Sequence, residues 1–340
     1  MEGNRDIIVI GGSTGAIDVV CRILDGLPND LEAAIFIVVH MAPASPNFHV
    51  DIFQNHTELP VNYAADREPI ELGRVYVAPA DRHLLIKAGE VRVIHGPKEN
   101  NFRPAIDPLF RSAATTYDGR VIGVVVTGAL DDGTHGLMQI KRAGGTTIVQ
   151  SPEEAVEPSM PTSAIRRMEI DYVLHTDEIG PVITDLVGQS TQVATTLGED
   201  ETDVSEGLVS ALRLSKVGAP SMYTCPDCNG ALWEIQDGNV IKFRCHVGHG
   251  FALDTLLMRQ ATEIEQALWS AVRGFEERAA LQKRTANNAV NTREVRDRLL
   301  ANSREQQQMA DLVRSILMKP RQVDEINIGK AVEHEYGGDR

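Results

Sequence analysis

The chain has 340 residues, 42% hydrophobic and 24% charged, with a formal net charge of −15. This composition is typical of a globular protein with room for one large domain and a smaller one, and the acidic balance argues against a nucleic-acid-binding surface. No apolar run is long enough to cross a bilayer, and the N-terminus has no signal-peptide core. We therefore expect a cytoplasmic protein that neither inserts into a membrane nor binds nucleic acid.

Residues 1–190 alternate short apolar runs with helical patterns. The runs do not alternate polar and apolar residues, which is typical of strands buried on both faces of a parallel sheet. The segment 84–94, with Gly89 at its centre, indicates an antiparallel hairpin added to that sheet. The predicted fold class is α/β, with a doubly wound, mostly parallel sheet. Its expected strands are 7–10, 35–39, 75–78, 121–126, 146–149 and 172–174.

The pattern changes after residue 190. An acidic, polar stretch followed by Gly and Pro predicts a linker over 191–222, with a short helix at 205–215. Further on, apolar residues recur at spacings of three, four and seven, which predicts a long amphipathic helix and a second helix returning against it. We expect a helical hairpin over 252–320 that packs or dimerises, and a disordered tail over 321–340.

Three of the four cysteines lie between these helices and the linker. Cys225 and Cys228 are separated by two residues, a spacing that presents two thiolates to one tetrahedral metal. Sixteen residues separate Cys228 from Cys245, and they contain a hairpin predicted at Asp237-Gly238. The pattern predicts a zinc-ribbon-like module over 223–251 that holds a structural zinc.

The fourth ligand of this site is left open by the sequence. His249 lies at a suitable spacing from Cys245, whereas His246 adjoins Cys245 and would strain a shared site. A set of reduced structural cysteines is the alternative to zinc. We expect the module, separated by the acidic linker, to be independent of the α/β domain.

The stretch 7–20 contains the pattern G-x-S-x-G at Gly11, Ser13 and Gly15, between a predicted strand and a predicted helix. A dinucleotide fingerprint would need Gly at position 13, and a P-loop would need a Lys that is missing here. Small flanking residues allow a sharp turn that exposes the Ser hydroxyl, with the amide of Thr14 directed at a developing oxyanion. A glycine-rich turn with an incidental Ser is the alternative.

A nucleophilic Ser needs a base and a group that orients the base. His40 ends the second predicted strand, and Asp131 and Asp132 follow the strand 121–126. Because ligands bind outside the carboxyl ends of strands in open α/β sheets, these side chains are expected to meet Ser13 at one edge. The sequence thus predicts a triad of Ser13, His40 and one of the two Asp residues.

Five separated blocks within residues 5–190 resemble the catalytic domain of CheB, the chemotaxis receptor protein-glutamate methylesterase. The resemblance implies hydrolysis of glutamyl methyl esters on the cytoplasmic helices of chemoreceptors, with release of methanol, and deamidation of receptor glutamines. It implies no cofactor for catalysis. The blocks are IGGSTGA, VVHMAP, VYVAPADRHL, NNFRPAIDPLFRSAA, and VVVTGALDDGTHGL continued by AGGTTIVQSPEEAVEPSMP.

The same resemblance implies a role for each site residue. Ser13 would be the nucleophile, His40 the general base and Asp132 the orienting carboxylate. Asp131 stands where the family commonly has Asn, and its extra charge would alter the basicity of His40. The backbone amides of Thr14 and Ala129 would form the oxyanion hole, although many members carry Met at the latter position.

Three further residues are secondary candidates. Arg103 would hold an acidic receptor segment and His83 would line the same cleft, with solvated loop residues as the alternative for both. Asp107 is better explained as a structural or helix-capping group.

The typical family enzyme also has an N-terminal receiver domain, whereas this chain begins at the catalytic strand. We therefore expect no control by phosphorylation in cis. The C-terminal helices are a candidate site for a separate signalling partner. The alternatives to a receptor methylesterase are a non-catalytic adaptor that uses the ribbon and helical hairpin, and an esterase for another protein.

Overall fold

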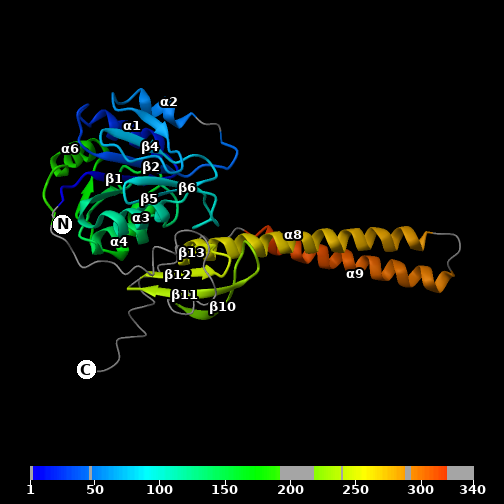
Figure 1. The fold of residues 1–340 in the computed structure, drawn as a ribbon. Helices are drawn as coiled ribbons and strands as arrows, with labels where there is room; N and C mark the ends of the chain where they lie inside the picture. Colours follow the sequence, from blue (N-terminus) through cyan, green and yellow to red (C-terminus); the bar gives the residue numbers. More distant parts are fainter. Residues whose placement is uncertain (1–2, 46–47, 192–217, 239, 288–291, 320–340) are drawn as a thin grey trace. The chain divides into compact units, whose positions relative to one another are not determined.

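The structure, a computed structural model, describes residues 3–45, 48–191, 218–238, 240–287 and 292–319 (Figure 1). The chain divides into two compact units, Met1–Arg259 and Gln260–Arg340. Most of the predicted linker, the short helix at 205–215 and the tail at 321–340 lie outside the described residues. The domain boundaries at 190 and 222 therefore stay predictions.

The first unit is built on a seven-stranded sheet in which every neighbouring pair is parallel. This confirms the predicted α/β class with a mostly parallel sheet. In spatial order the strands are β3 (Val61–Tyr63), β4 (Arg74–Val77), β2 (Ala34–Val39), β1 (Ile7–Gly12), β7 (Val121–Val125), β8 (Thr146–Gln150) and β9 (Tyr172–Leu174).

Helices cover both faces of this sheet (Figure 1). Successive residues of β1 enter different cores: Ile8 and Ile10 pack in one, and Ile7 and Val9 in the other. Burial on both faces explains why the strands read as continuous apolar runs. The first core contains residues of α1 (Ala16–Asp25), α2 (His49–Gln54) and α6 (Thr176–Leu186), and the second those of α3 (Ile106–Tyr117), α4 (Thr134–Arg142) and α5 (Ser159–Arg167).

The predicted hairpin is present as β5 (His83–Lys87) and β6 (Glu90–Ile94), but it forms a two-stranded sheet of its own. The prediction that it extends the main sheet is wrong. It packs on α3 instead, where the Ser112 hydroxyl accepts a hydrogen bond from the backbone N–H of Ile86 at 3.0 Å. The hydroxyl thereby supplies the hydrogen-bond acceptor that this buried backbone N–H needs.

A second, four-stranded antiparallel sheet completes the first unit, and we call it the C-terminal sheet. Its small core contains Leu232, Phe243 and Phe251 beside two of the cysteines. Its side chains also form hydrogen bonds to the α/β domain, with which it shares one compact unit. The independence of the two in folding and activity stays a prediction. The strands are β10 (Ala219–Thr224), β11 (Ala231–Asp237), β12 (Val240–Cys245) and β13 (Gly250–Ala252).

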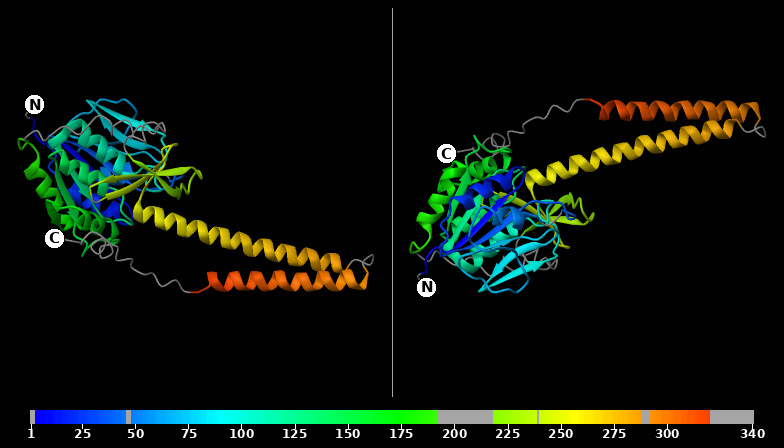
Figure 2. Two further views of the ribbon diagram at one scale, coloured as in Figure 1. Left: turned by 90° about the horizontal axis from the view of Figure 1, so that it is seen from below. Right: turned by 90° about the horizontal axis from the view of Figure 1, so that it is seen from above.

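Two long helices follow, α8 (Leu253–Ala286) and α9 (Arg293–Leu317), and they run side by side (Figure 2). In the second unit the Ser303 hydroxyl donates to the carbonyl of Ala279 at 2.8 Å, and Arg314 pairs with Glu276. None of the helices described is long and apolar enough to cross a membrane.

Candidate active site

The ends of three adjacent strands bring the predicted triad residues together. The backbone pairing of β2, β1 and β7 continues just past the strands, because His40 N donates to Gly12 O at 3.0 Å and Ser13 N donates to Thr127 O at 2.9 Å. Residues that are distant in sequence are therefore fixed side by side by the strand order 2-1-7. This is the edge at which ligands bind in open α/β sheets.

The glycines around Ser13 are needed for a tight strand-to-helix turn. A Cβ atom at Gly11 would lie 2.3 Å from Ile106 Cγ2, and one at Gly12 would lie 2.6 Å from the Cβ of Ala16. Gly15 has φ of 78°, a left-handed conformation that side chains rarely adopt. The turn thus leaves Ser13 half-buried, one turn before α1 begins.

His40 is fixed by two contacts. Its Nε2 lies 2.8 Å from Asp132 Oδ2, with both side chains 2% exposed, and its ring stacks on Phe102 with the centroids 3.8 Å apart. Nδ1 is buried and has no hydrogen-bond partner among the described residues. No hydrogen bond joins this nitrogen to Ser13 there, as is common when a catalytic site holds no substrate. Nδ1 is the ring nitrogen that remains available for a proton.

The Asp132 carboxylate is oriented by five donors. Besides His40, Oδ2 accepts from Ile106 N at 2.7 Å; Oδ1 accepts from Asp107 N at 3.1 Å, Gly133 N at 3.0 Å and Asn100 Nδ2 at 2.8 Å. Two of these amides belong to the first turn of α3, where unpaired N–H groups and the helix dipole favour a negative charge. Asp132 is thereby held as the acceptor for the imidazole.

Asp107 lies in the first turn of α3, and its carboxylate bonds to the first turn of α4. Its Oδ1 accepts from Gly136 N at 2.7 Å in the first turn of α4, in agreement with the expected capping role. Its Oδ2 accepts from Lys242 Nζ on β12 at 2.8 Å. Burial alone would raise the pKa of Asp107, but Lys242 and nearby cations lower it below its ordinary value.

Asp131 points its polar contacts elsewhere than the triad. Its Oδ1 accepts from the Thr255 hydroxyl at 3.1 Å, and its Oδ2 lies 3.4 Å from Arg167 Nη1. Within the described part of the chain no hydrogen bond joins it to His40. Burial raises the pKa of Asp131 from 3.8 to about 7. The positive charge of Arg167 opposes this shift, and the negative charge of Asp254 adds to it.

This shift predicts that Asp131→Asn stabilises the fold at alkaline pH. The folded-state pKa lies above the unfolded one, so the carboxyl costs stability progressively as pH rises from about 4 to about 7 and in full above that range. The variant should gain up to about 4 kcal/mol at pH 8 and little at pH 4. Chemical denaturation at both pH values measures this, with the exposed Asp30→Asn as control. An equal effect at both pH values would contradict it.

Two backbone amides flank the Ser13 turn without a protein acceptor in the described residues, those of Thr14 and Ala129. Leu130, next to Ala129, has φ of 67°, an uncommon conformation for a bulky side chain and one that tends to occur at functional sites. A Cβ at Gly128 would lie 2.9 Å from the Cβ of Ser13, so glycine keeps the turn open. Two free amides beside a hydroxyl are what an oxyanion hole requires.

The profile of the CheB methylesterase family matches residues 8–183, which is more than half of the chain and includes Ser13, His40 and Asp132. The chain belongs to the CheB methylesterase family. Against the crystal structure of the CheB methylesterase catalytic domain of Thermotoga maritima, it is 37% identical with a TM-score of 0.52. That comparison covers 54% of this chain and all of the other.

The chain is also similar to proteins that are named protein-glutamate methylesterase/protein-glutamine glutaminase. One from Thermotoga maritima is 37% identical over 185 residues, and one from Anaeromyxobacter dehalogenans is 36% identical over 181. The chain spans about half the length of these two, 54% and 53%. A protein of Leptospira interrogans, provisionally given the same name, is 39% identical over 177 residues, 92% of its length.

Both secondary candidates make contacts that stabilise the loop before α3. Arg103 pairs with Asp81, with Nη2 2.6 Å from Oδ1, and its Nη1 donates to Gly96 O. His83 is buried; its Nε2 lies 2.8 Å from Pro97 O, and its Nδ1 accepts from Ala105 N. These contacts support the loop, and a role in substrate binding stays a prediction for both residues.

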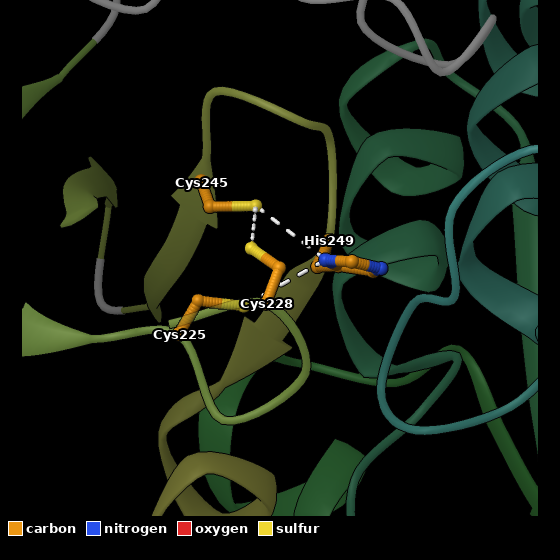
Figure 3. A group of neighbouring side chains, drawn as sticks. All are labelled: Cys225, Cys228, Cys245 and His249. Carbon is orange, nitrogen blue, oxygen red and sulfur yellow. Dashed lines mark hydrogen bonds between the residues drawn. The ribbon is translucent and has the colours of Figure 1, made fainter. Parts of the chain in front are cut away.

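Outside the residues shared with the CheB methylesterase family, four side chains form the Cys/His cluster: Cys225, Cys228, Cys245 and His249 (Figure 3). Their ligand atoms all lie within 4.8 Å of one another, and Cys228 Sγ is 3.7 Å from Cys245 Sγ. A disulfide would bring these sulfurs to about 2 Å. The cluster is therefore suited to a metal ion. His246 is exposed and does not belong to it.

Asn100 and Phe102 are the site residues that sequence reasoning missed. Both lie in the block NNFRPAID, from which only Arg103 and Asp107 are chosen by their charge. A neutral amide and a ring carry no such signal. Asn100 and its partner Asp132 are 32 residues apart in sequence, and Phe102 is further still from His40, so neither contact follows from local spacing.

Proposed function

We propose that this chain is a protein-glutamate methylesterase that hydrolyses glutamyl methyl esters to glutamate and methanol, and that it also deamidates protein glutamine. The observation that carries the proposal is Ser13 on its glycine turn beside the buried His40–Asp132 pair. Membership in the CheB methylesterase family, with relatives named for both activities, supports it.

In the proposed reaction, Ser13 Oγ attacks the ester carbonyl carbon as His40 Nδ1 takes its proton. Asp132 at Nε2 keeps the proton of the neutral ring on that nitrogen and stabilises the imidazolium. The amides of Thr14 and Ala129 donate to the oxyanion. The intermediate collapses, His40 returns its proton to the leaving methoxide, and methanol departs.

Water then replaces the alcohol and hydrolyses the glutamyl-Ser13 ester, with His40 as base again. With a glutamine substrate, ammonia leaves in the first half-reaction instead of methanol. The chemistry needs no cofactor. Asp131 takes no part in it, since its contacts go to Thr255 and Arg167.

The proposed substrates are methylated side chains on the cytoplasmic helices of chemoreceptors, so we place the protein in the cytoplasm. Arg103 and His83 remain candidates for contact with the receptor. The C-terminal helices remain a candidate surface for a separate signalling partner.

We further propose that the metal of the Cys/His cluster is zinc in a ribbon-like module. In a tetrahedral zinc site, bonds of about 2.3 Å to sulfur and 2.0–2.1 Å to nitrogen place two sulfurs about 3.8 Å apart and a sulfur and a nitrogen about 3.6 Å apart. The corresponding distances here are 3.7 Å from Cys228 Sγ to Cys245 Sγ and 3.6 Å from Cys245 Sγ to His249 Nδ1. Four protein ligands make a closed, structural site.

Methanol release from a methylated chemoreceptor tests the function. The wild-type chain should release methanol with a matching loss of methyl groups in the mass of receptor peptides. Turnover of a small carboxylic ester without turnover of the receptor would instead indicate an esterase for another protein. Turnover of neither, by folded protein, would favour the adaptor.

A further inference from the structure

A neutral side chain, Asn100, joins the C-terminal sheet to the carboxylate that orients His40. Asn100 is 3% exposed, and its Nδ2 donates to Asp132 Oδ1 at 2.8 Å. Its Oδ1 accepts from Ala252 N, in β13 of the C-terminal sheet, at 2.9 Å. One amide thus connects the C-terminal sheet to the proposed triad.

The contact from β13 decides which way this amide faces. The two ends of an Asn amide are similar in shape, and only the hydrogen-bond network distinguishes the oxygen from the nitrogen. Ala252 N is a donor and can be satisfied only by Oδ1. The amide must therefore present its N–H groups toward Asp132, where an oxygen in their place would repel the carboxylate.

The backbone of the Asn100 loop is paired with the same strand. Asn100 N donates to Gly250 O at 2.9 Å, and Gly250 N donates to Lys98 O at 3.2 Å. Beside them Glu99 forms a buried ion pair with Arg111 of α3, Nη2 to Oε1 at 2.8 Å, and one with Arg244 of β12 at 2.6 Å. The loop is clamped between the C-terminal sheet and α3.

A second contact joins the C-terminal sheet to Asp107, the residue whose backbone N–H bonds to Asp132. Lys242 Nζ donates to Asp107 Oδ2, the oxygen that also accepts from Asn100 Nδ2 at 3.2 Å. Asp107 in turn offers its backbone N–H to Asp132. Without the ammonium, a second buried negative charge would stand next to Asp132 with less compensation, which is costly in an interior of low polarity.

We propose that Asn100 is a positioning residue for Asp132 and His40, and that the C-terminal sheet holds it in its working orientation through Ala252 and Lys242. The inference rests on the proposed esterase function. The sheet thereby becomes part of the catalytic unit, although none of its residues touches the substrate.

The test compares two neighbouring asparagines. Asn100 and Asn101 both have positive φ, 48° and 74°, so glycine at either position removes the side chain without straining the backbone. Asn101 has no hydrogen bond from its side chain in the described residues, which makes Asn101→Gly a matched control. On a small soluble ester, Asn100→Gly should lower kcat about 10- to 100-fold, with KM changed less than about threefold. Asn101→Gly should stay within about twofold of wild type.

Two more measurements separate positioning from simple destabilisation. The low-field proton NMR signal of the His40–Asp132 hydrogen bond should shift or broaden in Asn100→Gly at a temperature where the protein is folded. Lys242→Met, from the sheet side, should reduce kcat as well, whereas Lys141→Met, which removes the ion pair with Asp171 in the α/β domain, should not.

Equal kcat for Asn100→Gly and Asn101→Gly would overturn the proposal, and so would an unchanged low-field signal. If Asn100→Gly does not fold, the lysine pair decides: equal kcat in Lys242→Met and Lys141→Met would overturn it. Lack of any esterase activity in folded wild-type protein would instead count against the proposed function.

Discussion

Ser13→Ala is expected to abolish hydrolysis of both a small ester and a receptor methyl ester, while the protein keeps its fold. Removal of a triad member costs about 10⁴- to 10⁶-fold in kcat in hydrolases of this chemistry. The loss arises because no other group takes the place of Oγ on the glycine turn, whose geometry depends on Gly11, Gly12 and Gly15. Steady-state kinetics measures the loss.

The control for this variant is Ser270→Ala, which removes an exposed hydroxyl from α8 and should leave kcat unchanged. A melting temperature close to wild type in both variants separates chemistry from folding. Ser13→Ala with wild-type turnover would mean that Ser13 is not the nucleophile.

Substitution of the other two proposed triad residues, His40 and Asp132, should also lower the rate of hydrolysis. His40→Ala should lose activity to a similar extent, because no other base remains for the hydroxyl proton. Asp132→Asn should lose about 10⁴-fold, since an amide cannot hold the tautomer that leaves Nδ1 free. It also puts an NH₂ group among the five donors that surround Asp132, so a lower stability is expected.

The parallel sheet could be predicted from the sequence because strands that are buried on both faces consist almost entirely of apolar residues. Runs such as 35–39 and 121–126 are apolar throughout, and their ends bring His40 and the 127–133 loop to one edge in any doubly wound order. It could not predict that the hairpin at 84–94 packs on α3, since a strand pair with one covered face has the same alternation wherever it docks.

Only those site residues could be predicted that are marked by a reactive side chain and by their position at the end of a strand. Ser13, His40 and Asp132 are reactive residue types at strand ends, whereas Asn100 acts through a bond to the backbone of Ala252, 152 residues later. Backbone donors are the same at every position, so no sequence pattern marks them. The Asp131 side chain illustrates the converse: its charge suggested an effect on His40, but its contacts go to α5 and α8.

One zinc should co-purify with each chain, and Cys228→Ser or chelation should remove it and unfold the C-terminal sheet. Leu232, Phe243 and Phe251 form too small a core to hold the sheet alone, whereas a structural zinc contributes about 10–16 kcal/mol to folding. Elemental analysis follows the zinc, and the fluorescence of Trp233, measured in a Trp269→Phe background, follows the unfolding. His246→Ala, which changes an exposed neighbour of Cys245, should keep its zinc; His249→Ala should lose it.

Loss of the metal should also reach the active site. If the sheet orients Asn100, then Cys228→Ser should lower kcat on a small ester about as far as Asn100→Gly does, with KM little changed. The two changes together should cost no more than either alone, because both break the same link between β13 and Asp132. Additive losses would mean that the metal acts on catalysis by another route. Full activity in metal-free protein would mean that the α/β domain orients Asn100 without the sheet.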